Sequence, residues 1–123
     1  MKEEPELVVQ LNGDKHWVLN GELHRENGPA MELASGTQKW YLNGKMHRED
    51  GPAAIYSYGS QQWWIHGEPH REDGPAVEYD DGSKEWYIYG EQLTEEEFNS
   101  WVLQKRLHAN LLDRSTKGRK IKV

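Results

Sequence analysis

The residues best suited to chemistry are three copies of one block, His-Arg-Glu followed by Asn or Asp, then Gly-Pro-Ala. We call these blocks, residues 24–30, 47–53 and 70–76, hooks 1, 2 and 3. Each hook gathers an imidazole, a guanidinium and carboxylates, the side chains that ligate metals or act as general acids and bases. The three imidazoles belong to His24, His47 and His70.

The spacing of the hooks argues against a shared metal. If each unit adds two strands, equivalent residues lie about 9 to 10 Å apart, whereas ligands lie about 2 Å from a zinc ion. A single hook offers one histidine and a few acids. We therefore predict structural hooks, whose His and Arg bind turn carbonyls or pack on tryptophan rings, and a chain with neither metal nor cofactor.

The arginines of the hooks allow a sharper alternative. Arg25, Arg48 and Arg71 could form a row that binds anions such as phosphate. The adjacent Glu26, Glu49 and Glu72 would neutralise most of its attraction, which favours a ladder of alternating charge instead.

Catalysis has little support. The chain has no cysteine, no nucleophile elbow, no glycine-rich phosphate loop before a helix and no histidine pair at metalloprotease spacing. We expect a protein that is not an enzyme and has no catalytic residues.

The hooks belong to a longer 23-residue repeat. Aromatic and β-branched runs alternate with glycine turns, as in β-hairpins. The predicted fold is mainly β, with tandem hairpin repeats in an elongated twisted sheet or a solenoid. The array covers residues 1–93, with a half-repeat at 5–12 and repeats starting near 16, 39, 62 and 85. The period is carried by Trp17, Trp40, Trp63 and Trp86, by Gly13, Gly36, Gly59 and Gly82, and by Gly21, Gly44, Gly67 and Gly90.

Strand alternation assigns side chains to faces. The four periodic tryptophans should stack as a ladder and form the core. The other face then carries Tyr41, Trp64 and Tyr87, with Tyr58 and Tyr89 nearby. We predict that this aromatic row binds a partner, although a second buried face would have the same pattern.

A C-terminal α-helix should cap the array over residues 94–113. Thr94 and Glu97 form a capping box, and Phe98, Trp101 and a leucine series follow at helical spacing. The helix is expected to dock on the last hairpin or on a partner. Residues 114–123 are predicted to form a basic, flexible tail.

Composition limits the partners and the compartment. The chain has 123 residues and a net charge of −6, but residues 1–93 hold eight basic and seventeen acidic residues. Direct nucleic-acid binding by this acidic body is not expected. The lack of cysteine and of a long apolar run suits a cytoplasmic protein without membrane contact.

The segment Trp40-Tyr41-Leu42-Asn43-Gly44-Lys45-Met46 followed by hook 2 resembles a short tandem repeat of tailed bacteriophages, large viruses and some bacteria. The resemblance covers residues 5 to about 100. The unit is also distantly similar to the MORN repeat, from which it departs at Arg48-Glu49-Asp50-Gly51-Pro52, so lipid functions are not carried over. The resemblance implies a viral accessory protein in a bacterial host and supplies no catalytic residues.

Three hypotheses follow. The first is an inhibitor or adaptor, encoded by a phage, that binds a host protein such as a nuclease or another defence enzyme, as anti-CRISPR proteins do. The second is a sponge for a nucleotide signal, held by Arg25, Arg48 or Arg71. The third is a homo-oligomeric structural protein whose N-terminal half-repeat pairs edge to edge.

Overall fold

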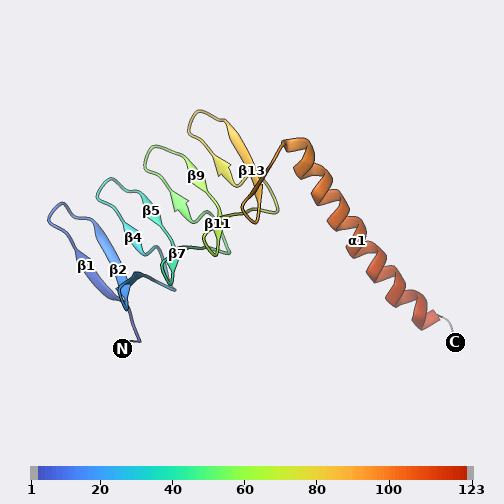
Figure 1. The fold of residues 1–123 in the computed structure, drawn as a ribbon, viewed down its shortest axis with the longest axis horizontal. Coiled ribbons are helices and arrows are strands. Elements are labelled where there is room, and N and C mark those ends of the chain that lie inside the picture. Colours follow the sequence, from blue (N-terminus) through green and yellow to red (C-terminus); the bar gives the residue numbers. More distant parts are fainter. Residues whose placement is uncertain (1–2, 122–123) are drawn as a thin grey trace.

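The computed structural model describes residues 3–121, with side chains up to residue 113. The fold is mainly β, with antiparallel strands in a sheet that does not close and one C-terminal helix (Figure 1). The elements are β1 (Glu6–Val9), β2 (Lys15–Leu19), β3 (Glu22–Leu23), β4 (Met31–Glu32), β5 (Gln38–Lys39), β6 (Tyr41–Leu42), β7 (Lys45–Met46), β8 (Ala54–Ile55), β9 (Gln61–Gln62), β10 (Trp64–Ile65), β11 (Glu68–Pro69), β12 (Val77–Glu78), β13 (Lys84–Ile88), β14 (Glu91–Leu93) and α1 (Glu95–Ile121).

One ten-stranded sheet runs through the molecule in the order β1-β2-β4-β5-β8-β9-β12-β13-β14, with β3 paired to β2. The N-terminal strand β1 pairs with β2, so that Leu7 lies opposite Trp17.

Two segments of the chain pair with different partners before and after a periodic tryptophan. Gln38 and Lys39 pair in the main sheet, whereas Tyr41 and Leu42 pair with β7 in a separate hairpin, so the chain changes partner at Trp40. The same division falls at Trp63, between β9 and β10. Residues 31–53 and 54–76 therefore each contain one hairpin in the main sheet and one short hairpin that leads into a hook.

The short hairpins turn through two consecutive residues with positive φ. Asn20 and Asn43 adopt φ of 50° and 49°, as expected for Asn-Gly turns, and each is followed by a glycine with positive φ. His66 and Tyr89 take the same conformation, with φ of 47° and 45°. Bulky side chains are strained in this region, so these two turns need support from outside the turn.

The buried core consists mostly of small residues rather than of the predicted tryptophan ladder. Ala30, Ala53 and Ala76, one from each hook, have no exposed surface. The four periodic tryptophans are only half-buried. The prediction that they form the core is wrong, because the alanine and the histidine of each hook are buried instead. The hook histidines are His24, His47 and His70, each 7% exposed.

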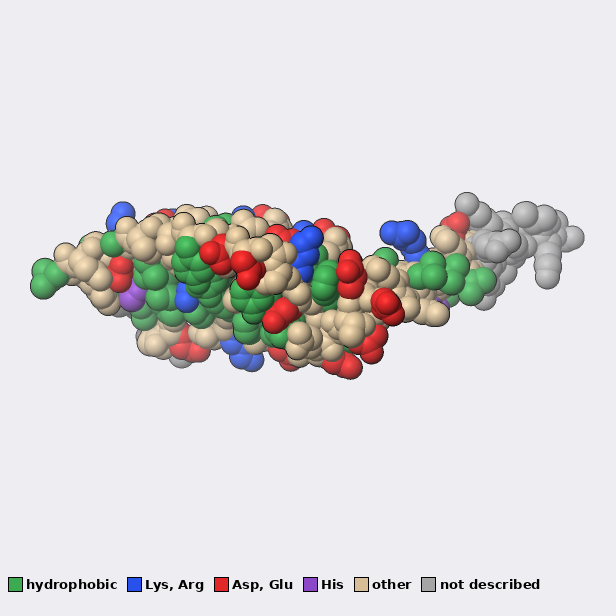
Figure 2. All heavy atoms as spheres, turned by 90° about the horizontal axis from the view of Figure 1, so that it is seen from above, with side chains coloured by type: hydrophobic (Ala, Val, Ile, Leu, Met, Phe, Trp, Pro, Cys, Tyr) green, Lys and Arg blue, Asp and Glu red, His purple; other side chains and the backbone are tan. Residues whose placement is uncertain are grey.

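Helix α1 extends away from the sheet (Figure 1) and continues past residue 113, where its end was predicted. The capping box is present: the Thr94 N–H donates to Glu97 Oε1 (2.8 Å) and the Glu97 N–H donates to Thr94 Oγ1 (3.1 Å). Only the start of the helix packs closely, with Phe98 5% exposed. Leu103, Leu107 and Leu111 are exposed, and Figure 2 shows hydrophobic side chains on the projecting helix.

In the part of the chain that the structure describes, no helix has both the length and the apolarity needed to cross a membrane.

Candidate functional site

The arginine of each hook folds back over the sheet and makes two repeated contacts. Its guanidinium lies over the periodic tryptophan at 3.7 to 4.0 Å from the ring centroid, and its Nη1 donates to the proline carbonyl four residues later at 3.0 to 3.1 Å. Both contacts were predicted as structural roles for the arginines. The hook glycine permits this closure, because a Cβ on Gly51 or Gly74 would lie 3.0 Å from the guanidinium carbon.

The histidine of each hook binds the next short turn along the chain. Nδ1 of His24 accepts the Asn43 N–H at 2.9 Å, and His47 and His70 accept the N–H of His66 and Tyr89 at 2.9 and 2.8 Å. These donors are the positive-φ residues of the following short hairpins. The histidines therefore provide the outside support that these strained turns need.

This bond determines which ring nitrogen of each hook histidine carries hydrogen. Nδ1 can accept only when it carries no proton, so each neutral imidazole holds its hydrogen on Nε2. Burial lowers the pKa of His47, and the nearby His66 lowers it further, while Glu49 opposes the shift. The neutral form required by the bond is thus the form that burial favours.

The geometry leaves the arginines little capacity for an anion. Besides the proline carbonyl, Arg48 binds Asp50 at 3.0 Å, and Arg71 binds Asp73 at 2.9 Å and Glu78 at 3.1 Å. Three carboxylates already surround two guanidiniums. Within the described residues, no three His, Cys, Asp or Glu side chains lie close enough together to hold a metal ion.

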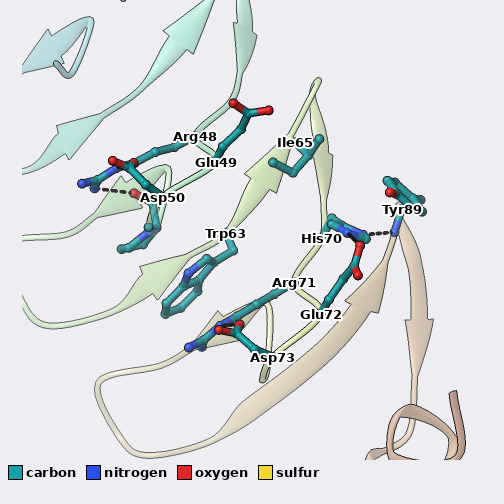
Figure 3. A pocket seen from close by; sticks show the side chains of 12 residues that line it. Arg48, Glu49, Asp50, Trp63, Ile65, His70, Arg71, Glu72, Asp73 and Tyr89 are labelled. Carbon is teal, nitrogen blue, oxygen red and sulfur yellow. Dashed lines mark hydrogen bonds and ion pairs between the residues drawn. The ribbon is translucent and has the colours of Figure 1, made fainter. Parts of the chain in front are cut away.

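Grooves separate successive hooks. The groove between hooks 2 and 3 has a volume of about 730 Å³, with Trp63 and Ile65 in its lining. Figure 3 shows Arg71 against Trp63, and Glu72 beside His70. A groove of about 660 Å³, with Trp40 and Leu42 in its lining, separates hooks 1 and 2.

The other side of the sheet carries a continuous row of aromatic residues, which we call the aromatic face. Tyr41, Trp64 and Tyr87 follow Lys39, Gln62 and Glu85 by two residues, and Tyr56 and Tyr79 follow Ala54 and Val77 in the same way. Since directly paired residues share a face, the cross-strand register puts Lys39, Ala54, Gln62, Val77 and Glu85 on one side. Lys39 Nζ lies 5.2 Å from the centroid of the Tyr56 ring, and Trp64 and Tyr87 bond to Gln62 and Glu85, so these rings lie on that side too. Tyr41 and Tyr79 are close enough to Tyr56 and Tyr87 to interact with them electrostatically. The aromatic face consists of Tyr41, Tyr56, Trp64, Tyr79 and Tyr87.

Polar neighbours orient the rings of the aromatic face. Trp64 Nε1 donates to Gln62 Oε1 at 3.0 Å, and the Tyr87 hydroxyl donates to Glu85 Oε1 at 3.2 Å. Burial raises the pKa of the Tyr41, Tyr56 and Tyr87 hydroxyls. The hydroxyls therefore remain protonated near neutral pH, and those of Tyr41 and Tyr56 can donate hydrogen bonds to a partner.

The structure separates the five residues predicted to bind a partner. Tyr41, Trp64 and Tyr87 belong to the aromatic face, and Tyr58 adjoins it through a stacked contact with Tyr56 at 5.3 Å. Tyr89 instead stacks on His70 of hook 3 at 3.8 Å.

Tyr56 and Tyr79 were missed by the prediction. They directly follow β8 and β12, and their position two residues after Ala54 and Val77 was the available signal.

Comparison with protein-family models, curated proteins and solved structures finds no match for this chain.

Proposed function

We propose that this chain is a non-enzymatic protein-binding module whose partner contacts the aromatic face. The observation that carries the proposal is the row of five half-buried or exposed aromatic side chains on one face of an open sheet. Tyrosine and tryptophan are the side chains that concentrate binding energy in protein interfaces. Figure 2 shows hydrophobic side chains gathered along the body of the molecule, with acidic side chains among them.

The module is, in our proposal, a tandem array of 23-residue units that displays equivalent side chains at regular intervals. Recurrent contacts support this architecture. Three turn glycines each donate their N–H at 2.9 Å to the carbonyl just before the preceding hook, Gly44 to Leu23, Gly67 to Met46 and Gly90 to Pro69. The hook histidines make their bonds over 19 residues in all three cases.

The partner we propose is a host protein in the bacterial cytoplasm, such as a nuclease or another defence enzyme, which a phage-encoded inhibitor would occupy. The resemblance of the repeat to phage proteins supports this assignment. The acidic charge of residues 1–93 also favours a partner with a basic surface, as nucleases have.

Affinity purification from bacterial lysate tests this proposal. The tagged wild-type chain should retain a specific protein, and Trp64→Ala with Tyr87→Ala should release most of it. Ser35→Ala, a change in an exposed loop, is the matched control and should retain it. A chain that elutes alone at low salt, or a partner that the double variant retains fully, contradicts the proposal.

A homo-oligomer is a second candidate that one observation favours. Strand β1 forms an edge of the sheet, and Leu7, Val8 and Val9 are 49, 45 and 58% exposed. An apolar edge strand can pair with a second copy. Light scattering decides this question, because a monomer at high concentration removes the candidate.

A further inference from the structure

Hook 3 already holds a basic side chain. Lys105 of α1 forms an ion pair and a hydrogen bond with Oε1 of Glu72, while Oε2 of the same carboxylate lies 2.9 Å from Nε2 of His70. The Lys105 hydrogen bond lowers the pKa of Glu72. Hook 3 thus presents a histidine-oriented carboxylate that receives a helix-borne lysine.

Lys105 also contacts an aromatic ring of its own helix. Its Nζ lies 4.8 Å from the centroid of the Trp101 ring, one helical turn earlier. The two residues line a small cavity of about 280 Å³ against Glu72, together with Val102 and Ala109. The contact therefore combines a cation with an apolar helix surface.

Hooks 1 and 2 have the equivalent glutamate, but Lys105 pairs only with the glutamate of hook 3. Glu26 and Glu49 lie 3.8 and 4.0 Å from Nε2 of His24 and His47, and their side chains are 78 and 84% exposed. The corresponding value for Glu72 is 38%. Glu26 and Glu49 stand beside the two open grooves, each of which has a tryptophan and an aliphatic side chain in its lining.

The sequence explains why only hook 3 is occupied. Helix α1 begins at Glu95, one full repeat after Glu72, so the helix stands where a fourth hook would follow. A helix that carries Lys105 therefore lies beside the last hook, whereas the earlier hooks are followed by another hook.

We propose that hooks 1 and 2 form a docking site for a basic α-helix of a partner protein, with Glu26 and Glu49 receiving its lysines as Glu72 receives Lys105. Successive hooks are two strands apart, or about 9.5 Å. Seven residues of α-helix span about 10.5 Å and return to the same face. The ligand is therefore a helix with lysines seven residues apart, laid along the row of hooks.

This site goes beyond the proposed function, because the hooks lie on the side of the sheet opposite the aromatic face. The test uses a fluorescent synthetic peptide, rich in alanine and glutamine and long enough for several helical turns, with Trp four residues before each of two lysines set seven apart. A second peptide of the same composition sets the lysines five apart, on different faces of the helix. Anisotropy at low salt measures binding of both peptides to the full chain.

The first peptide should bind, and Glu26→Gln with Glu49→Gln should weaken its binding about five-fold, as expected for two partly exposed ion pairs. Trp64→Ala with Tyr87→Ala should leave its affinity unchanged, so failure here and failure of the aromatic face are distinguishable. Circular dichroism checks that the exposed Glu→Gln changes preserve the fold. Absence of binding, equal binding of both peptides, or equal affinity of the Gln variant would each overturn the proposal.

Discussion

Removing a hook arginine should destabilise the protein more than loss of an exposed charge can. In Arg48→Ala, the Trp40 ring loses a guanidinium at 4.0 Å and the Pro52 carbonyl loses a donor at 3.0 Å. The cation–π contact contributes about 0.5 to 1 kcal/mol, and a hydrogen bond from a charged donor about 1.5 to 3 kcal/mol. The exposed pair with Asp50 adds at most about 1 kcal/mol. We expect the free energy of unfolding to fall by about 2 to 5 kcal/mol.

Urea unfolding followed by tryptophan fluorescence measures this loss. Arg48→Lys is the matched variant: it keeps the charge but loses the planar group that stacks on the ring while donating to the carbonyl, so it should cost about 1 to 2 kcal/mol. Arg106→Ala, an exposed arginine on α1, should cost less than about 0.5 kcal/mol. If Arg48→Ala unfolds within about 0.5 kcal/mol of the wild type, the structural role assigned to the hook arginines is refuted.

Three further changes test the hooks and the helix. Because burial lowers the pKa of His47 in the folded state, the unfolded chain binds the proton more readily; stability should be complete above about pH 7 and should fall as pH drops below about 6.5, and His47→Gln should flatten part of this dependence in thermal melts. Gly74→Ala should cost about 1 to 3 kcal/mol, since its Cβ would press on Arg71, and the cost should shrink in an Arg71→Ala background if a double-mutant cycle is measured by urea unfolding. Thr94→Ala removes the capping hydroxyl and should cost about 0.5 to 2 kcal/mol with reduced helical circular dichroism; an unchanged helix content argues against the cap.

Much of the fold could be predicted because strand alternation and turn residues are local signals. The mainly β class, the antiparallel strands and the C-terminal helix are confirmed. The capping box at Thr94 was also readable, because its two partners are three residues apart.

The core could not be predicted in the same way. Which residues are buried depends on how the hooks fold over the sheet, and the contacts of the arginines and histidines decide this. His66 and Tyr89 were not expected at positive φ, because their turns lack the usual asparagine. Their support comes from histidines 19 residues earlier, a relation that no local pattern contains.

Only the part of the candidate site that depends on local strand alternation could be predicted. Alternation placed Tyr41, Trp64 and Tyr87 on one face, but the contribution of Tyr56 and Tyr79 depends on the cross-strand register. Tyr89 was predicted to lie with them, but its ring stacks on His70 of hook 3.

Site-specific photocrosslinking in bacterial cells tests the binding role of the aromatic face most directly. A benzoylphenylalanine at position 79 or 87 should cross-link the chain to the same protein that affinity purification retains, and the same probe at position 35, in an exposed loop, should not. Equal cross-linking from position 35, or none from positions 79 and 87 while the partner is retained, would contradict the account.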